Sequence, residues 1–293
     1  MVSAMLRHIR DILTDAVLAG GVRILDVQRR GSIGARYKDA TELVTDADRE
    51  SDAAILAVLQ TRIPGIDPSI SFHLEESGVT GTPGRKRVGA DPLDGTSHFA
   101  TGGNLYSVQA HYIEDGVPLV GVVFQPEVYL PLSVTESPAG RLVSAIRGEG
   151  AMVYRTEFAG DAFRVSEGRR VVKRPRSPTR TFVACVPITG KMTLEERALA
   201  RKVHESGLIG GMTGTGGAGA NVMMAIFGGH EVYANFGAGD DLDLAPAQVI
   251  AQEAGLTVWG PDRRPPVWHV RKQPVIVAPD DEIAELFLRA AGF

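Results

Sequence analysis

The sequence predicts an α/β protein whose first half is α+β and whose second half is α/β. In the first half, two stretches with helical periodicity precede several strand-like runs joined by tight turns, which predicts two helices on a largely antiparallel sheet. In the second half, strand-like and helix-like stretches alternate. A chain of 293 residues with 44% hydrophobic residues has enough core for about two domains. We expect an N-terminal domain over 1–160 and a C-terminal domain over 161–293.

Two helices are expected at the start of the chain. Apolar residues recur every three to four positions over 5–27, which is typical of a helix with one buried face, although Gly20-Gly21 could interrupt it. A second helix is expected between Thr45 and Pro64. Strands are then expected over 88–90, 107–113 and 117–124. Asp115-Gly116 predicts a tight hairpin between the last two strands.

A basic stretch separates the two expected domains. Residues 164–180 include seven Lys or Arg and two Pro, which is typical of a solvated loop or linker, with a phosphate-binding patch as the alternative. Beyond this stretch, strands are expected over 181–186 and 231–236, and helices over 195–205, 221–227 and 244–254.

Composition excludes several classes of protein and of site. Thirty-one Lys and Arg against 35 Asp and Glu leave a net charge of -4, so we expect no nucleic-acid polymer as a partner. The single cysteine, Cys185, excludes an intramolecular disulfide and a thiolate-rich zinc site. No apolar run approaches the ~20 residues that span a bilayer, so no membrane partner is expected. Charged residues within the first apolar-periodic stretch do not fit a signal peptide, which favours a cytoplasmic location.

Acidic residues gather at four places that flank the expected elements, namely 45–48, 75–77, 91–96 and 240–243. Asp91 and Asp94 close a short strand, where Pro92 and Gly95 favour a bend. The bend can turn both carboxylates and the Leu93 carbonyl toward one point. Carboxylates that converge repel one another unless cations neutralise them, and Mg²⁺ suits an all-oxygen site. By itself, however, the segment is equally typical of a turn that caps a helix.

Several further segments accompany these acidic groups in a fixed order along roughly residues 5–275. Together they are Lys38 with Glu42-Leu43-Val44-Thr45 and Asp48, Phe72-His73-Leu74-Glu75-Glu76-Ser77, Asp91-Pro92-Leu93-Asp94-Gly95-Thr96-Ser97-His98-Phe99, Gly121-Val122-Val123, Gly148-Glu149-Gly150-Ala151, Gly216 to Asn221, Gly228-Gly229 with Tyr233, Asp243-Leu244-Ala245 and Glu253-Ala254-Gly255. The set resembles the inositol monophosphatase-like family of Mg²⁺-dependent, typically lithium-sensitive phosphatases. The superfamily also includes bisphosphate nucleotidases and fructose-1,6-bisphosphatases.

The resemblance implies a layered αβαβα sandwich of the inositol monophosphatase and fructose-1,6-bisphosphatase type, with the site in the cleft between the two halves. It also implies hydrolysis of a small-molecule phosphate ester, an inositol or sugar phosphate, by water that two or three Mg²⁺ activate; Mn²⁺ is an alternative metal. Family members commonly form homodimers, so a homodimer is expected.

The resemblance further implies a role for each matching residue. The metal ligands would be Glu75, Asp91, the Leu93 carbonyl, Asp94 and Asp243. The catalytic residues would be Asp48, Thr96 and Glu75. The residues in contact with phosphate or substrate would be Gly95, Thr96, Ser97, Ala218 and Asn235. The hydroxyl of Thr96 would relay the proton of the attacking water to Asp48.

Departures from the family pattern bear on the substrate. Leu74 and Leu242 replace a Gly and a Trp of the pattern, and we expect both changes to affect packing only. Asn235 stands where inositol phosphatases carry a Glu that contacts ring hydroxyls, and one extra residue separates Asn235 from Asp243. These departures argue against inositol 1-phosphate as the main substrate. A 3′(2′),5′-bisphosphate nucleotidase, a fructose-1,6-bisphosphatase and a phosphatase for a specialised sugar phosphate stay open as alternatives.

Two other classes of function fit less well. Gly214 to Gly219 matches G-x-G-x-x-G, but residues 205–212 before it hold three glycines and make a poor strand, which argues against a dinucleotide site. The loop could instead approach the leaving group of the substrate, or simply form a packed turn. A non-catalytic binding or regulatory protein is disfavoured because all the expected acting residues are present, namely Asp48, Glu75, Asp91, Asp94, Thr96 and Asp243.

Four charged residues near the expected site are given other roles. Glu76 is expected to be structural, and Asp240 and Asp241 are expected to be solvated. Lys38 is expected either to face solvent or to pair with the carboxylates of the cleft.

Overall fold

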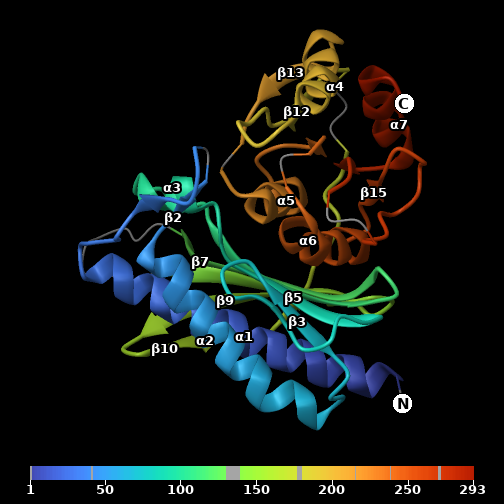
Figure 1. Ribbon diagram of the computed structural model, residues 1–293. Helices are drawn as coiled ribbons and strands as arrows, with labels where there is room; N and C mark the ends of the chain where they lie inside the picture. Colours follow the sequence, from blue (N-terminus) through green and yellow to red (C-terminus); the bar gives the residue numbers. More distant parts are fainter. Residues whose placement is uncertain are drawn as a thin grey trace.

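The computed structural model describes residues 2–40, 42–129, 139–176, 180–214, 216–237, 239–269 and 272–293. Over this part of the chain the elements form five layers in the order helices, sheet, helices, sheet, helices (Figure 1). The helices, from one outer layer to the other, are α1 (Val2–Arg29), α2 (Asp46–Arg62), α5 (Ala218–Phe227), α6 (Asp241–Glu253), α4 (Leu194–Glu205) and α7 (Asp281–Ala291). The expected αβαβα sandwich is confirmed.

The first sheet contains nine strands within the described residues, in the order β10-β9-β8-β7-β6-β5-β3-β4, with β11 paired to β9. These strands are β3 (Ser71–Leu74), β4 (Gly78–Thr80), β5 (Lys86–Asp94), β6 (Ser107–Glu114), β7 (Val117–Tyr129), β8 (Ala139–Ile146), β9 (Gly150–Ala159), β10 (Ala162–Val165) and β11 (Arg169–Arg170). The sheet is largely antiparallel, as expected, but β3 runs parallel to β5.

The second sheet has the strand order β13-β12-β14-β16-β15. Its strands are β12 (Phe182–Cys185), β13 (Ile209–Met212), β14 (Val232–Asn235), β15 (Thr257–Trp259) and β16 (Val275–Ala278). β12 runs parallel to both of its neighbours, whereas β16 is antiparallel to β14 and β15. The short elements are β1 (Arg36–Tyr37), β2 (Leu43–Val44), η1 (Ile63–Gly65) and α3 (Thr96–Ala100).

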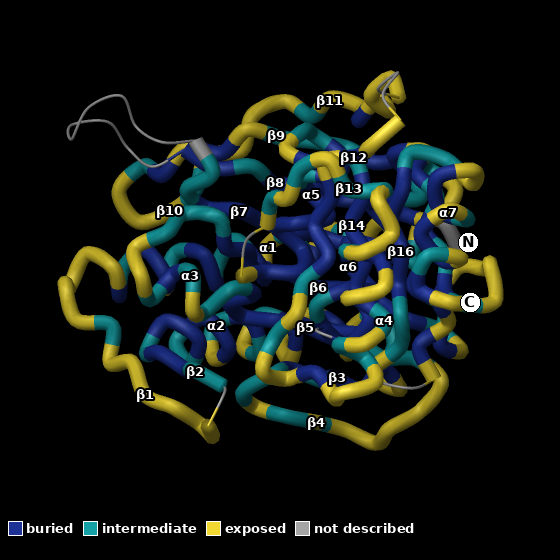
Figure 2. The backbone as a smooth tube through the Cα atoms, turned by 90° about the horizontal axis from the view of Figure 1, so that it is seen from above, coloured by how far each residue is buried: buried dark blue, intermediate teal, exposed yellow. Residues whose placement is uncertain are grey.

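Both faces of the first sheet are buried, as strand β6 illustrates. Val108, Ala110 and Tyr112 belong to the apolar core that also contains α1 and α2. The alternate residues of the strand point the other way, toward α5 and α6. Helix α6 lies between the two sheets and is buried along most of its length (Figure 2). Because α5 and α6 belong to the second half of the chain yet pack against the first sheet, the two halves share one core.

Helix α1 is continuous, so Gly20 and Gly21 do not interrupt it. A Cβ atom on Gly20 would lie 2.5 Å from the Ser51 hydroxyl of α2, and one on Gly21 would collide with the ring of Phe124 on β7. The two glycines therefore allow the close approach of α1 to its neighbours. The hairpin expected at Asp115-Gly116 joins β6 to β7, with both residues at positive φ (52° and 77°) as a tight two-residue turn requires.

Some sequence-based expectations need correction. Residues 205–212 were expected to make a poor strand, but β13 lies there as an edge strand paired to β12, an exposed position that tolerates its glycines. The basic stretch 164–180 contributes residues to β10 and β11, so the first sheet continues past residue 160. Residues 177–179 of that stretch lie outside the described residues. The domain boundary after residue 160 stays a prediction. No helix among the described residues is long and apolar enough to cross a membrane.

Candidate active site

The end of strand β5 brings two aspartates to one face of the sheet. In an unbroken strand, residues three positions apart point to opposite faces. Here Asp91 pairs with Gln109 of β6 and Asp94 pairs with Ser107. Between these two pairs β5 has two residues and β6 has one, so β5 contains a one-residue bulge. This bulge reverses the alternation and turns both aspartates toward the same side. The irregular pairing, rather than the turn chemistry of Pro92 and Gly95 alone, explains why the two carboxylates converge.

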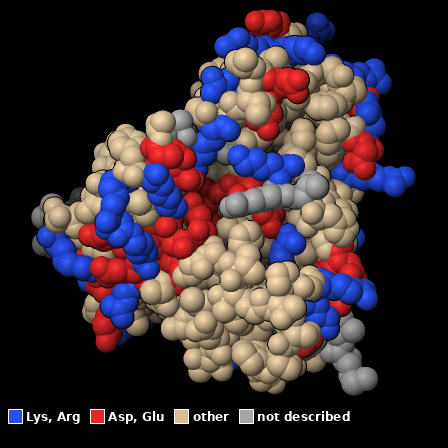
Figure 3. Space-filling view, in the orientation of Figure 1, with Lys and Arg blue, Asp and Glu red and all other residues tan. Residues whose placement is uncertain are grey.

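Helix α6 adds a third carboxylate to this pair. Asp91, Asp94 and Asp243 each offer an oxygen atom, and the three atoms lie within 4.8 Å of one another. Asp91 and Asp94 are almost fully buried, at 2% and 5% exposure. Asp243 lies in the first turn of α6, where its carboxylate accepts a hydrogen bond from the Asp240 amide at 2.7 Å. Figure 3 shows acidic side chains gathered in the hollow between the two halves, with Lys and Arg along its rim.

Burial and mutual repulsion disfavour the negatively charged forms of these carboxylates. Burial raises the pKa of Asp91 well above its ordinary value, and the neighbouring Glu75, Asp243 and Asp94 raise it further. Burial likewise raises the pKa of Asp243, with Asp240 and Asp94 adding to the effect. A bound cation would reverse this balance, because it stabilises the charged form of each ligand.

The first turn of α5 holds Asp94 in place. The carboxylate of Asp94 accepts hydrogen bonds from the amides of Ala218, Gly219 and Ala220 at 2.8, 2.9 and 3.4 Å, and one from the Ser107 hydroxyl at 2.9 Å. A Cβ atom on Gly217 would lie 2.6 Å from Asp94 Oδ2, so this position requires glycine. The amide of Ala218, a predicted substrate contact, is therefore engaged by Asp94.

These contacts account for the glycine-rich loop before α5. A dinucleotide site would place a pyrophosphate on the first-turn amides of the helix. Here the carboxylate of Asp94 takes that position. A Cβ atom on Gly214 would lie 3.0 Å from the Cys185 thiol, so this glycine also serves close packing. Thr215 lies outside the described residues.

Asp48 and Thr96 form a second polar group beside the cluster. Asp48 Oδ2 accepts hydrogen bonds from the amide and the hydroxyl of Thr45 at 2.7 and 2.6 Å, in the capping box of α2. The Thr96 hydroxyl lies 2.8 Å from Asp48 Oδ1 and 3.0 Å from the Leu93 carbonyl oxygen. Burial raises the pKa of Asp48, while the hydrogen bonds from Thr45 and Thr96 oppose that rise. The predicted catalytic pair is thus in direct contact.

Glu75 lies beside Asp91 because β3 is parallel to β5. Leu74 pairs with Ala90, and the next amide along, that of Glu75, donates to the Ala90 carbonyl at 3.3 Å. Burial raises the pKa of Glu75, whereas the nearby ammonium of Lys38 lowers it. Lys38 Nζ lies 3.5 Å from Glu75 and donates a hydrogen bond to Glu76. Lys38 therefore pairs with the carboxylates of the cleft, one of its two expected roles, and Glu76 holds it there.

Lys191 is a residue at this site that the sequence did not point out. Burial lowers the pKa of Lys191, but its hydrogen bond to Glu42 at 2.8 Å and the charges of nearby carboxylates, Glu75 and Asp243 among them, together outweigh that effect and raise the pKa. The signal in the sequence is weak, since Lys191 is a single lysine in a loop before α4, far from every motif. Only the fold brings this loop over the acidic cluster.

The remaining predicted residues occupy distinct positions. Gly95 has φ +95°, and its carbonyl accepts hydrogen bonds from the first turn of α3. The amides of Gly95, Thr96 and Ser97 therefore lie at the start of that short helix. Asn235 is fully buried: its Nδ2 donates to the Tyr233 hydroxyl and its Oδ1 accepts from the Gly237 amide, both at 2.8 Å. Both ends of this side-chain amide, predicted to contact substrate, are therefore hydrogen-bonded within the protein.

Asp240 and Asp241 are buried, which corrects the expectation that solvent surrounds them. Asp240 caps α6 and accepts a hydrogen bond from the Leu242 amide at 2.9 Å. Asp241 forms an ion pair with Arg87 at 2.7 Å. The pattern of adjacent acidic residues in the sequence does not distinguish a solvated run from a helix cap followed by a buried ion pair.

The family model described as the inositol monophosphatase family matches residues 5–292. The chain belongs to the inositol monophosphatase family. Among curated proteins it is similar to inositol-1-monophosphatase from Synechocystis sp., with 36% identity over 117 residues, 40% of this chain and 39% of that protein. It is also similar to Nus factor SuhB from Haemophilus influenzae (31% over 151 residues, 51% of each) and to histidinol-phosphatase from Mycobacterium tuberculosis (34% over 118 residues, 40% and 44%). The chain thus matches about half of the length of these relatives, or less.

Solved structures share the whole fold of this family member. SuhB from Bartonella henselae has a TM-score of 0.74 at 20% identity, covering 97% of this chain and 98% of that one. Inositol monophosphatase from Anabaena has a TM-score of 0.69 at 21% identity, covering 97% and 95%. A structure of IMPase/NADP phosphatase complexed with Mg²⁺ and phosphate has a TM-score of 0.66 at 18% identity, covering 92% and 90%. At these identities the likeness shows the fold.

Proposed function

We propose that the protein is a Mg²⁺-dependent phosphomonoesterase that hydrolyses a small phosphorylated metabolite, an inositol or sugar phosphate, by direct attack of water. One observation carries the proposal. The carboxylates of Asp91, Asp94 and Asp243 converge within 4.8 Å, beside the hydrogen-bonded pair of Asp48 and Thr96. Membership of the inositol monophosphatase family supports the same activity.

The donor atoms at the site fit a hard divalent cation. They are carboxylate oxygens and one backbone carbonyl, which Mg²⁺ prefers, and Mn²⁺ also accepts such ligands. One ion would be held by Glu75, Asp91 and the Leu93 carbonyl, and a second by Asp91, Asp94 and Asp243; the proposed number is two or three. A bound ion would lower the pKa of a coordinated water and neutralise charge on the phosphoryl group. The related structure that contains Mg²⁺ and phosphate supports this choice of metal.

Asp48 and Thr96 would move the proton of the attacking water. The two hydrogen bonds from Thr45 engage Oδ2 of Asp48 and so keep its Oδ1 directed at the Thr96 hydroxyl. The hydroxyl can therefore give its proton to Asp48 while its oxygen accepts one from water. Lys38 and Lys191 would add positive charge at the rim, and the amides of residues 95–97 would meet phosphate oxygens.

The test is phosphate release from a panel of inositol 1-phosphate, several sugar phosphates, fructose 1,6-bisphosphate and adenosine 3′,5′-bisphosphate, each with Mg²⁺, with EDTA and with Li⁺. Asp91→Asn is the loss-of-function variant, and Asp67→Asn, which alters an aspartate outside the site, is its matched control. We expect Mg²⁺-dependent, Li⁺-inhibited release of phosphate, which Asp91→Asn abolishes and Asp67→Asn does not. The ester that is hydrolysed most efficiently identifies the substrate class of the protein. Absence of release from every ester, with folded protein and Asp91-dependent Mg²⁺ binding, would favour the non-catalytic alternative.

The same resemblance supports a homodimer, and composition supports a cytoplasmic location. Light scattering coupled to size-exclusion chromatography measures the first, and fractionation of cells that express the native protein measures the second.

A further inference from the structure

Lys191 brings a positive charge to the proposed site from the second half of the molecule. It lies in the loop before α4, and its ammonium forms an ion pair at 2.8 Å with Glu42, a residue of the first half. The side chain is 43% exposed, so a ligand in the cleft can reach it. Its charge also interacts with those of Glu75 and Asp243, two of the proposed metal ligands. Lys191 therefore lies at the mouth of the site, where the two halves meet.

A second lysine at the site, Lys38, is held more firmly. It donates a hydrogen bond to Glu76, whose side chain is 14% exposed, and Glu76 is not a proposed metal ligand. The partner of Lys191, by contrast, is a carboxylate that is 32% exposed, and water weakens such an ion pair. An anion in the cleft can therefore compete for Lys191 more readily than for Lys38.

The charge on Lys191 is in excess once the acidic cluster is neutralised. The proposed carboxylate ligands carry four negative charges, which two divalent cations balance. The cluster then no longer attracts Lys191, while the ion pair with Glu42 remains. An ammonium in such a position favours a further anionic group beside the phosphate of the substrate.

Other polar groups that the second half brings to the site are hydrogen-bonded within the protein. The side-chain amide of Asn235 is bonded at both ends, to Tyr233 and to Gly237. The backbone amide of Ala218 donates to Asp94. The proposed phosphate contacts, the amides of residues 95–97, belong to the first half, so the leaving group extends toward the second. It meets the ammonium of Lys191 there, and not the two amides that were predicted to contact it.

We propose that Lys191 is a specificity-determining residue, and that the substrate is a phosphate ester whose leaving group carries a second anionic group, a carboxylate or a phosphate, which pairs with the Lys191 ammonium. The inference rests on the proposed function for the position of the substrate. It narrows the substrates of that proposal to esters such as sugar bisphosphates and phosphorylated sugar acids.

Binding is measured by calorimetry at constant free Mg²⁺ in the double variant Asp48→Asn, Thr96→Val, in which we expect esters to bind without being hydrolysed. The esters form matched pairs that differ in one anionic group. A carboxylate is tested by 3-phosphoglycerate with glycerol 3-phosphate and by 6-phosphogluconate with glucitol 6-phosphate. A phosphate is tested by fructose 1,6-bisphosphate with fructose 1-phosphate and by adenosine 3′,5′-bisphosphate with adenosine 3′-phosphate. We expect the more anionic ester of at least one pair to bind about tenfold more tightly.

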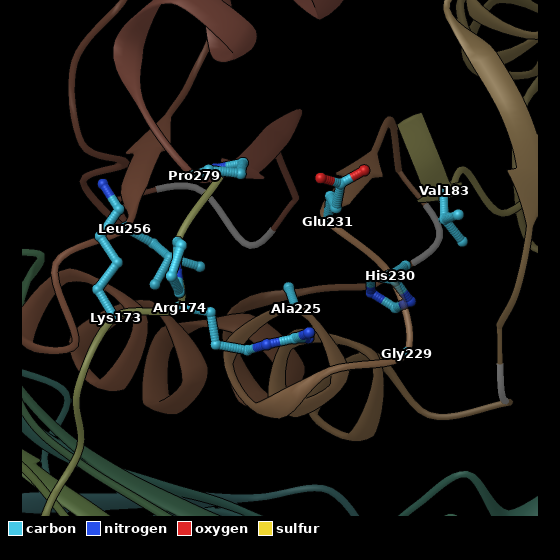
Figure 4. Close-up of a pocket in the computed structure, with 10 residues that line it drawn as sticks. Lys173, Arg174, Val183, Ala225, Gly229, His230, Glu231, Leu256 and Pro279 are labelled. Carbon is cyan, nitrogen blue, oxygen red and sulfur yellow. The ribbon is translucent and has the colours of Figure 1, made fainter. Parts of the chain in front are cut away.

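Substitutions of Lys191 in the same background identify the source of this preference. Lys191→Met should abolish it and change the affinity for the less anionic ester by less than about twofold. Lys191→Arg keeps the charge and should keep most of the preference. Lys173→Met is the matched control and should have no effect, because Lys173 is an exposed lysine of the second half that lines a separate cavity (Figure 4). Circular dichroism checks that each variant is folded.

Equal affinity within every pair would overturn the inference, as would a preference that Lys191→Met leaves intact. An equal loss of affinity for both esters of a pair in Lys191→Met would also overturn it, because Lys191 would then only shape the site. Phosphate release from the protein with Asp48 and Thr96 intact tests the proposed function separately. Absence of release together with Lys191-dependent binding would overturn only the proposed hydrolysis, whereas binding of no ester would overturn both proposals.

Discussion

The two ends of helix α5 meet opposite charges. At its amino end, three amides hold the carboxylate of Asp94. At its carboxyl end, Arg174 packs so closely that a Cβ atom on Gly228 would lie 2.5 Å from the guanidinium. Both arrangements agree with the helix dipole, which favours anions at the first turn and cations at the last. The difference lies in what surrounds them: the amino end faces other carboxylates that repel one another, and the carboxyl end faces a cavity of about 350 Å³ whose lining includes Lys173, Arg174 and His230.

One short helix thus contacts a carboxylate at one end and a guanidinium at the other, with no charged residue of its own. The backbone supplies the complementary partial charge at each end, and glycines admit the close approach. Substitutions at either end should therefore separate a metal-site effect from a purely structural one.

The largest effect is expected at the amino end. Asp94→Asn removes a negative charge from the proposed metal site but keeps an oxygen that the α5 amides can approach. Phosphate release should fall about 10³-fold, because a group that stabilises charge at the reacting centre is lost. Steady-state kinetics with the best substrate of the panel measures this, beside the control Asp67→Asn. Activity within about threefold of wild type in the folded variant would show that Asp94 is not a ligand of a catalytic metal ion.

A smaller loss is expected from the neighbouring proton path. Thr96→Val keeps the shape of the side chain but removes the hydroxyl that donates to Asp48, so kcat should fall about 10²-fold. Thr96→Ser restores the hydroxyl and should recover most of the activity. If Val and Ser variants were equally impaired, the hydroxyl would have no part in proton transfer, and only the volume of the side chain would matter.

Substitution of the glycines at the two ends of α5 tests whether the two ends act separately. Gly217→Ala needs no unusual backbone angle, since φ is -97°, but its Cβ would press on Asp94. Gly228→Ala adds a side chain at φ +116°, which disfavours any L-residue, and its Cβ would meet Arg174. Both variants should lose about 1–2 kcal/mol of unfolding free energy. Mg²⁺ affinity should fall about tenfold in Gly217→Ala and much less in Gly228→Ala.

Urea unfolding gives the free energies, and titration of Mg²⁺ gives the affinities. An equal loss of Mg²⁺ affinity in the two variants would contradict the separation of the two ends, because it would mean that any disturbance of α5 reaches the cluster.

Periodicity predicted much of the fold, because the elements with strong amphipathic or turn signals lie where expected. The helix over 5–27, the hairpin at Asp115-Gly116 and the alternating second half are examples. The edge strand β13 was missed because its glycines lower strand propensity, while pairing with β12 on one side suffices to hold it. No local pattern reveals that α6 lies between the two sheets, since that position follows from long-range packing.

The candidate site likewise contains residues that the sequence identified and features that it did not. Asp91, Asp94 and Asp243 were identified from spacing and resemblance, and the structure brings them together. The bulge that turns Asp91 and Asp94 to one side depends on the register with β6, which the sequence of β5 does not contain. Lys191 and the buried pair of Asp241 with Arg87 were missed because each depends on partners more than a hundred residues away.

The smallest expected effect concerns the carboxyl end of α5 and its dependence on pH. Burial lowers the pKa of His230 to about 4, below the value of about 6.5 for an exposed histidine. Between these values the unfolded chain binds a proton that the folded protein does not, so stability falls as pH decreases through this window. Lowering the pH from about 6.5 to about 5.5 should cost about 1 kcal/mol of unfolding free energy from this residue. Urea unfolding at the two pH values measures the loss.

His230→Gln removes the titrating ring, so its pH dependence should be shallower than that of wild type by this amount. His111, which is also buried with a lowered pKa, stays in both proteins and cancels in the difference. The acidic cluster at the other end of α5 also stays in both, so its own titration cancels as well. A variant as pH-dependent as wild type would show that His230 takes up its proton within the folded state. Protonation would then add a cation to a cavity wall that already contains Lys173 and Arg174, and the charge difference between the two ends of α5 would grow as the pH falls.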